Sequence, residues 1–412
     1  MTRDAHSAAT RAVREHYSRV LALLAAQFRD VTAAEDALSD SLVAALQQWP
    51  KHGVPNNPAA WLLAVARRRL IDHHRRQGRH AAALERFAGD FDSLPDESEM
   101  EDKRLHLLFA CAHPAVEERV RAPLMLQVVF GLEASEIANL FLMSPAAMTQ
   151  RLVRAKQKIR DAAIPFKIPS PEDYPERLGF VLTAIYALFA VGYNAPVVPD
   201  AQRGNRDTPI FDALWLGQLV VALSRRHPEA LGLLSLMLFV ESRRTARRDS
   251  QGRYVPLSEQ MPSLWDFDAI VHANALLKEA ADKVAPGRFQ IEAAIQSVHA
   301  ARAQTGETDW ASILSFYDAL LVLTPTPVVL INRALAISHV HGVDAAFEDL
   351  HSLDDDARIA GYQPYWAARA HLLAKAGRSD EAEQAYAHAI ALESDPAVRE
   401  FLQTERELAQ RR

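Results

Sequence analysis

The chain has 412 residues, of which 49% are hydrophobic and 24% are charged, with 46 basic residues against 52 acidic ones. This length predicts two or three domains, and the single cysteine excludes a disulfide framework and a cysteine metal cluster. The longest apolar run, residues 178–193, is shorter than the ~20 residues that cross a bilayer, and the N-terminus lacks an apolar signal core, so we expect a cytoplasmic protein with no membrane partner.

Hydrophobic periodicity predicts helices throughout the first eighty residues. Apolar residues between positions 17 and 28 recur at spacings of three and four, which places them on one helical face. Thr32, followed by Glu35, predicts an N-cap with a capping box for the next helix. Asn57, with a proline directly after it, predicts the start of a third helix.

Charge is distributed unevenly along the chain. Residues 1–168 hold 23 basic and 20 acidic residues, whereas residues 169–412 hold 23 basic and 32 acidic ones. Residues 90–102, DFDSLPDESEMED, hold seven acids and no base, a composition typical of an exposed linker. We therefore expect two small basic modules, residues 10–88 and 103–165, joined by an acidic linker at residues 89–102.

The second module has the pattern of two helices joined by a tight turn. The segments are EASEIANLFL, which is short and amphipathic, then MSP, then the basic stretch AAMTQRLVRAKQKIR. This pattern predicts a helix-turn-helix, whose second helix enters the DNA major groove. Thr149, Gln150, Arg151 and Arg154 are the candidate base or backbone contacts. The alternative is a solvated charged face on an ordinary bundle helix.

These segments resemble motifs of one protein family. EIANLF and SPAAMTQRLVRAKQKIR resemble the E-I-A motif and the S-x-x-T-V-x-x-R-L-x-R-A recognition helix of bacterial sigma factors of the extracytoplasmic-function class. Upstream, AAEDALSDSLVAAL resembles that family's D-A-E-D-L-x-Q-E-x-F helix. NPAAWLLAVARRRLIDHHRRQGR resembles its F-x-x-W-L-x-x-I-A-x-N-x-x-I-D-x-x-R helix. The motifs stand in the family's order and cover residues 10–165.

The resemblance implies an all-α protein whose two modules grip promoter DNA with core RNA polymerase between them. Residues 10–88 resemble sigma region 2, which binds the polymerase clamp and captures a flipped minus-ten base in the loop at residues 47–57. Residues 103–165 resemble the region 4 helix-turn-helix, which binds the minus-thirty-five element beside the polymerase flap. The implied polymerase contacts are Glu35, Asp36, Leu38 and Asp40. The implied DNA contacts are Trp61, Arg67, Arg69, Arg75 and Arg76 in the first module, and Ser144, Thr149, Gln150, Arg151, Arg154, Lys156 and Lys158 in the second.

Two positions depart from the family pattern. Arg68 stands where the family has Asn, and Asp40 with the serine after it replaces a common Gln-Glu pair. We therefore expect differences in promoter readout and clamp contact but the same architecture. Nearby, His73, His74 and His80 lack acid or cysteine partners at ligand spacing, so we expect neither a metal nor a cofactor.

The C-terminal part is predicted to be a helical array. A proline-rich linker at residues 166–177 leads to residues 178–412, which are helical by periodicity. Its last part resembles tetratricopeptide repeats, and an unrelated helical bundle is the alternative. The matching repeat positions are Trp366, Ala370, Leu373, Gly377, Ala382, Tyr386 and Ala389, with Ala334 and Ala346 equivalent to Ala370 and Ala382 36 residues earlier.

Residues 178–412 as a whole resemble the extension of one sigma-factor subgroup, which carries a tetratricopeptide-type domain in place of a separate anti-sigma protein. The subgroup's F-N-E-G-Y motif reads FAVGY at residues 189–193, without the polar pair, so we expect different regulation. The resemblance implies a protein partner at the array. The acidic array would either mask the basic modules or brace them, and the apolar run next to the second module favours the brace.

A charged cluster lies within residues 178–412. It contains Glu241, Arg243, Arg244, Arg247 and Asp249, beside a hairpin turn predicted at residues 249–252. We expect interdomain salt bridges from this cluster, with ligand binding as the alternative.

Enzyme motifs are missing from the sequence. It holds no G-x-G-x-x-G, P-loop, H-E-x-x-H or G-x-S-x-G, which predicts a protein that is not an enzyme. The paired motifs predict a sigma factor that directs core RNA polymerase to promoters and is regulated through its own C-terminal domain. One alternative is a ligand-responsive repressor that binds palindromic DNA as a dimer. The other is a tetratricopeptide scaffold that binds no DNA.

Overall fold

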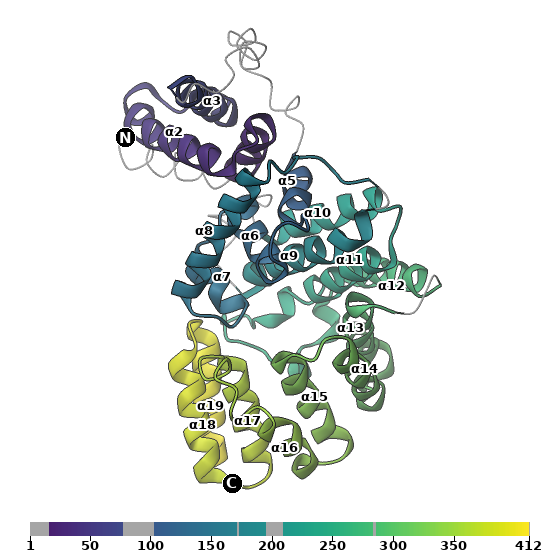
Figure 1. Cartoon of the computed structure of the whole chain (residues 1–412). Coiled ribbons are helices and arrows are strands. Elements are labelled where there is room, and N and C mark those ends of the chain that lie inside the picture. The colour runs from purple at the N-terminus through teal and green to yellow at the C-terminus, as the bar shows by residue number, and fades with distance from the viewer. Residues whose placement is uncertain (1–15, 77–102, 171–172, 195–208, 283–285, 412) are drawn as a thin grey trace. The chain divides into compact units, whose positions relative to one another are not determined.

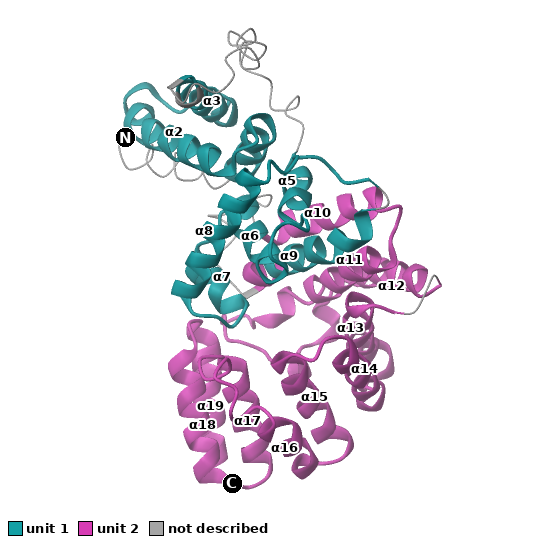
Figure 2. Ribbon diagram, in the orientation of Figure 1, with its two compact units in different colours: residues 1–188 teal, residues 189–412 magenta. Residues whose placement is uncertain are grey.

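The structure is a computed structural model that describes residues 16–76, 103–170, 173–194, 209–282 and 286–411 (Figure 1). Its regular elements are helices, which confirms the all-α prediction. The described residues contain no β-strand, and one isolated antiparallel bridge joins Arg248 to Tyr254 around the predicted turn. The chain divides into two compact units, residues 1–188 and residues 189–412 (Figure 2).

Unit 1 contains both basic modules. In the first module α2 packs against α3, and in the second α6 and α7 pack against α8. Their apolar faces follow the helical period that the sequence shows, so burial of those faces holds each module together. The helices are residues 16–28, α2 (Val31–His52), α3 (Pro58–Arg76), α5 (Arg104–Cys111), α6 (Glu118–Phe130), α7 (Ala134–Leu140), α8 (Pro145–Asp161) and the start of α9 (Tyr174–Asn194).

The start of α2 differs from the prediction. Asp30, rather than Thr32, is the N-cap, because its Oδ1 accepts a 3.0 Å hydrogen bond from a backbone N–H of the first turn. Such a cap satisfies a donor that has no partner inside the helix. Glu35 therefore lies beyond the cap, where its carboxylate can bind another element. The start of α3 follows the prediction, since Asn57 Oδ1 accepts a 2.9 Å bond from the Ala60 N–H.

Helix α9 holds the long apolar run. Over Tyr174–Tyr193 it is long and apolar enough to cross a membrane by length and composition, and 39% of that window is buried inside the structure. The apolar run itself begins only at residue 178, which makes it shorter than a membrane span, whereas the helix begins four residues earlier. A core helix passes the same test, so this feature alone is weak evidence for a membrane span.

Unit 2 begins with helices packed around α11. At Gly232 of α11 a Cβ atom would lie 2.7 Å from the Gln290 backbone nitrogen, so only glycine allows α13 to pass this close. The Glu229 carboxylate accepts hydrogen bonds of 3.0 and 3.2 Å from the first backbone N–H groups of α13. These two contacts fix the register of α11 against α13. The helices are α10 (Pro209–Leu223), α11 (Pro228–Glu241), α12 (Phe267–Ala281) and α13 (Arg288–Thr305).

The remainder of unit 2 is a row of adjacent antiparallel helices. The four alanines predicted to allow close helix packing, at positions 334, 346, 370 and 382, are fully buried. Arg333 of α15 ties the row together by binding Asp318 of α14 and Asp349 of α16, both at 2.7 Å. The helices are α14 (Trp310–Leu323), α15 (Pro327–Val340), α16 (Val343–His351), α17 (Gln363–Lys375), α18 (Ser379–Leu392) and α19 (Pro396–Arg411).

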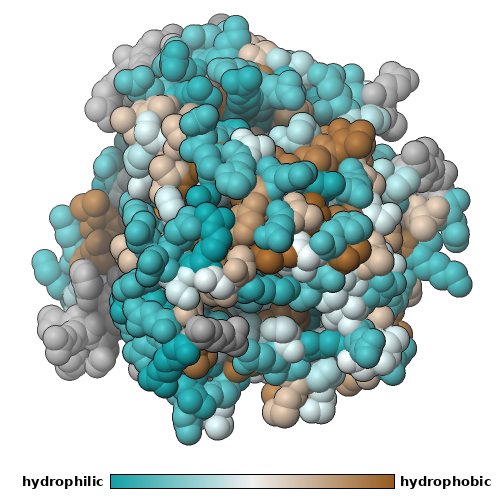
Figure 3. Space-filling view, turned by 90° about the horizontal axis from the view of Figure 1, so that it is seen from below, coloured by the Kyte–Doolittle hydropathy of each residue, from teal (hydrophilic) through white to brown (hydrophobic). Residues whose placement is uncertain are grey.

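Apolar side chains on the surface are scattered. On the face drawn in Figure 3 they form separate patches among hydrophilic side chains. The most exposed large apolar side chains of the described residues include Val322, Val271 and Val153, at 83%, 67% and 63%. Isolated exposed apolar side chains are normal for a folded protein and do not by themselves mark a binding surface.

Candidate nucleic-acid and polymerase interface

A tight turn joins α7 to α8. Leu142 in this turn adopts a left-handed conformation, with φ of 51°, and the backbone N–H of Met143 donates to the Ala138 carbonyl at 2.9 Å. Ser144 then caps α8, because its Oγ accepts a 3.3 Å hydrogen bond from a backbone N–H of the first turn. The structure therefore holds a short helix and a basic helix across a turn, as the sequence spacing indicated.

Helix α8 has two distinct faces. Its apolar face is buried through Met148, Leu152, Ala155 and Ile159. Its polar face is exposed through the predicted DNA contacts Ser144, Thr149, Gln150, Arg154 and Lys158. Arg151 is only half-exposed and contacts the Met143 sulfur at 3.9 Å. Five of the seven predicted contacts in this module therefore face solvent, where DNA could meet them.

Lys156 has a protein partner. Its Nζ donates to both carboxylate oxygens of Glu35 on α2, at 2.9 and 2.7 Å, and the two side chains are only 15% and 16% exposed. Burial raises the pKa of Glu35, and the neighbouring ammonium of Lys156 offsets part of that rise. A predicted DNA contact thus binds a predicted polymerase contact, and neither group is available to an outside partner while the pair is closed.

A second contact joins the same two modules. Gly131 ends α6 with φ of 69°, and a Cβ atom there would lie 3.1 Å from the ring of Tyr17. Burial is the main cause that raises the pKa of Tyr17 and of Cys111, and the charge of Glu35 acts in the same direction on each. The first and second modules of unit 1 therefore pack against each other around Glu35. No local sequence pattern indicates this contact, since its partners are far apart along the chain.

The remaining predicted polymerase contacts on α2 differ in exposure. Asp36 is exposed and can meet a partner directly. Leu38 is fully buried, so it holds α2 in the core and is not on the surface, which corrects the prediction. Asp40 binds Arg69 of α3 at 2.6 Å in an exposed pair, with side chains 60% and 43% exposed. An exposed pair of this kind is weak and opens easily.

The predicted DNA contacts on α3 differ in exposure. Arg67 Nε donates to Gln27 Oε1 at 3.0 Å, and Arg75 is exposed. Trp61 is half-buried and meets the ring of Trp49 edge-on, with centroids 5.4 Å apart. The Arg76 side chain lies outside the described part of the structure.

The predicted absence of a metal site concerns three histidines near the end of α3. Their side chains, His73, His74 and His80, also lie outside the described part. Within the described residues, no group of three or more His, Cys, Asp or Glu side chains could hold a metal ion.

The charged cluster at the end of α11 forms local ion pairs in unit 2. Glu241 binds Arg244 at 3.4 Å, and Asp249 binds Arg253 at 2.8 Å across the predicted turn. Arg243 is buried and has no carboxylate partner among the described residues. The expected salt bridges are therefore short-range ones, and the arginine at the centre of the cluster forms none of them.

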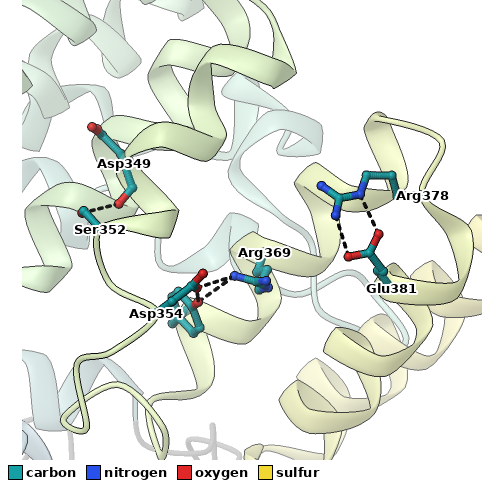
Figure 4. A network of polar contacts seen from close by, with 7 residues as sticks. Asp349, Ser352, Asp354, Arg369, Arg378 and Glu381 are labelled. Carbon is teal, nitrogen blue, oxygen red and sulfur yellow. Dashed lines mark hydrogen bonds and ion pairs between the residues drawn. The ribbon is translucent and has the colours of Figure 1, made fainter.

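A hollow of about 290 Å³ opens between α16 and α17. Figure 4 shows Asp354 and Arg369 turned toward one another there, and Arg369 Nη1 lies 2.7 Å from Asp354 Oδ1. The Tyr365 hydroxyl donates to the same carboxylate oxygen at 3.0 Å. Because these groups already bind each other, the hollow offers a ligand few polar or charged groups that lack a partner. The sequence did not single out this place.

Comparison with known proteins adds four findings. Residues 12–80 match sigma-70 region 2, and residues 177–281 match a family of unknown function (DUF6596). A protein of Rhizobium meliloti (strain 1021), described as uncharacterized, is 38% identical over 385 residues, which cover 91% of this chain and 89% of that protein. No solved structure matches the chain.

Proposed function

The chain belongs to the same family as the Rhizobium meliloti protein and carries sigma-70 region 2 in unit 1, and from this premise we propose that it is a sigma factor of the extracytoplasmic-function class. It would direct core RNA polymerase to specific promoters in the cytoplasm and start transcription without an enzymatic activity of its own. The region 2 match at residues 12–80 carries this proposal, because region 2 implies interaction with core RNA polymerase and promoter DNA. The repressor and scaffold alternatives explain no such match.

Helix α8 would read the upstream promoter element as the second helix of a region 4 helix-turn-helix. Thr149, Gln150 and Arg154 lie exposed in its first half, where such a helix meets base edges. Lys158 is exposed further along, where a cation meets phosphates and fixes the position of the helix. The first module would then hold the minus-ten element through the loop at residues 47–57 and the arginines of α3.

The contact between Lys156 and Glu35 would have to open before both modules engage their partners. A carboxylate that binds one ammonium through both oxygens cannot present them to polymerase, and the same ammonium cannot bind DNA. Hydrogen bonds between charged groups contribute about 2 kcal/mol, which favours the closed arrangement by a factor of about 30. Core polymerase would shift this equilibrium by binding the open arrangement more tightly.

We propose a tetratricopeptide-like role for the helical row of unit 2, as a brace for transcription and a surface for a protein partner. The buried alanines at the repeat positions support this proposal. Masking of the basic modules by the acidic array is the rival role. Truncation after Arg160 distinguishes the two: higher promoter activity would favour masking, whereas lost activity in a fragment that still folds would favour the brace.

Run-off transcription with purified core polymerase tests the proposed function. We expect transcripts from a promoter of this protein only when the chain is added, together with a stable complex between chain and core. A chain that bound its DNA tightly yet formed no complex with core would support the repressor instead. A chain that bound neither would support the scaffold.

A further inference from the structure

An unmatched guanidinium is buried in unit 2, just beyond the C-terminal end of α11. Arg243 is 5% exposed. Its Nη2 donates to Gln296 Oε1 on α13, whereas its Nη1, which is also buried, has no hydrogen-bond partner. Burial is the main cause that lowers the pKa of Arg243 to about 10; Tyr193 opposes this change, and the positive charge of Arg302 adds to it. The charge is thus held inside the unit by one neutral amide.

Such an arrangement is costly for the folded protein. Buried charges are otherwise paired with an opposite charge, because their lost hydration must be replaced. The negative end of the α11 dipole supplies only about half an elementary charge, spread over its last carbonyl groups. That partial charge leaves most of the positive charge of Arg243 without compensation.

Two neighbouring arginines are also held by neutral groups. Arg247 Nη1 donates to the Tyr193 carbonyl at 2.6 Å, and its guanidinium lies 3.8 Å from the centre of the Tyr193 ring. Arg302 donates to the carbonyls of Ser258 and Gln260 at 2.7 and 2.8 Å. Among the described residues none of the three arginines forms an ion pair with a carboxylate. The opposing charge nearby is that of Glu241, because Arg247 offsets part of the rise that burial causes in the pKa of Glu241.

Buried polar atoms without partners gather at the same place. Five of them lie between residues 241 and 265, and Arg243 Nη1 is one of these five. Three of the five are donors, namely Arg243 Nη1, Arg248 Nη1 and Trp265 Nε1, and the other two, Glu241 Oε2 and Gln260 Oε1, are acceptors. The guanidinium of Arg302 stands over the Trp265 ring, 5.3 Å from its centre. Native proteins satisfy nearly all buried polar atoms, so this concentration points to a missing partner.

We propose that Arg243, Arg247 and Arg302, with Trp265 Nε1 as a further donor, form a binding site for a small anion that carries a phosphate or carboxylate group. A guanidinium matches either group with two parallel N–H donors. Arg247 and Arg302 are partly exposed, so an anion meets them first. Arg243, Arg247 and Trp265 lie in the segment that matches the family of unknown function, and Arg302 lies beyond it. The site does not depend on the proposed role in transcription.

Thermal unfolding of the full chain tests the site directly. Sodium phosphate and sodium acetate are each compared with sodium chloride at equal ionic strength, because salts also stabilise proteins nonspecifically. We expect a rise in Tm that saturates with phosphate or with acetate, as ligand binding to the folded state requires. The anion that acts at lower concentration identifies the group. Equal Tm values in all three salts would overturn the proposal.

Two matched variants locate the site. Arg243→Met removes the unmatched charge and keeps a long side chain, so its Tm without added anion should equal or exceed that of the wild type. Its apparent affinity for the anion should fall by at least about tenfold. Arg244→Met changes an exposed neighbour that is already paired with Glu241, and it should respond to the anion like the wild type.

If the anion raised the Tm of Arg243→Met and of the wild type equally, the proposal would be overturned. The rise would then come from an adventitious ion only. If Arg243→Met does not fold, Arg302→Gln provides the equivalent test, because Arg302 is partly exposed. Calorimetric titration of the wild-type chain with phosphate gives a second readout that needs no variant. Absence of binding heat together with an unchanged Tm would contradict the proposal.

Discussion

The two units each bury a cation, and the difference between these cations lies in their partners. In unit 1 Lys156 meets both oxygens of Glu35, whereas in unit 2 Arg243 meets a single amide oxygen. Desolvation acts on both places, since it raises the pKa of Glu35 and lowers that of Arg243. The consequence of burying a cation therefore depends on whether its partner carries the opposite charge. A paired charge holds two modules together, and an unpaired one provides a place for an anion.

The direction of the energetic change also differs between the two places. In unit 1 the opposite charge comes from the chain itself, so any external partner must first break the pair. In unit 2 the opposite charge must come from outside, so binding removes a penalty already present in the folded protein. In unit 1 an outside partner must therefore displace one member of the ion pair before it can bind. Unit 2, by contrast, should become more stable when an anion binds.

Reversal of the Lys156 charge should have the largest effect. Lys156→Glu places two carboxylates together in a mostly buried contact, which should lower the free energy of unfolding by about 3–5 kcal/mol. Urea unfolding of the full chain measures this loss. The double variant that adds Glu35→Lys restores opposite charges and should recover most of the loss. A double variant no more stable than the single one would show that the pair does not hold the modules.

His299 reports the uncompensated field in unit 2. Burial, followed by the charges of Arg243 and Arg302, lowers its pKa from about 6.5 to about 4. The unfolded chain therefore binds a proton first as the pH falls, so the stability from this group is full above about pH 6.5 and is lost toward pH 4. The loss should approach roughly 3 kcal/mol over that window.

The matched variant for this measurement is His299→Phe, which keeps an aromatic ring edge-on to Trp310 and does not titrate. Urea unfolding at several pH values should show a steeper loss for the wild type than for the variant. Phosphate bound near the arginines would raise the His299 pKa and reduce the difference. Identical pH profiles for the two proteins would contradict the depressed pKa.

The exposed cations of α8 differ from the buried Lys156 and Arg243, because they can bind DNA directly. Arg154→Ala should weaken binding to the upstream promoter element by about 1–3 kcal/mol if Arg154 meets a base. Lys158→Ala should weaken binding to all sequences alike and reduce its salt dependence. Fluorescence anisotropy with specific and scrambled DNA measures both effects. Equal, sequence-independent losses at Arg151, Arg154 and Lys158 would show that α8 positions the protein and does not read sequence.

The smallest effect is expected at Arg69. Its pair with Asp40 is exposed, so Arg69→Ala should change the free energy of unfolding by less than about 1 kcal/mol. Arg68, its exposed neighbour, provides the matched control. Thermal unfolding of both variants should therefore give similar Tm values. A markedly lower Tm for Arg69→Ala alone would mean that even an exposed pair stabilises this module.

Most of the fold could be predicted from the sequence, but the candidate site could be predicted only in part. The family motifs identified Glu35 and Lys156 as site residues, yet nothing in them shows that the two bind each other across 121 residues. The capping box at Thr32 failed because Asp30, two residues earlier, caps the same turn. Local rules gave two acceptable caps there, and packing of α2 selected one.

The sequence by itself determined the helices, the turn before α8, the exposed face of α8 and the buried alanines of the helical row. Each of these depends on neighbours within a few residues, through the helical period, an N-cap or a small side chain. Only the tertiary structure decided which buried cation forms an ion pair with a carboxylate. It paired Lys156 with Glu35, left Arg243 with an amide and placed Leu38 in the core. The physical reason is that hydration and charge pairing depend on which distant segments meet, and no local pattern encodes that meeting.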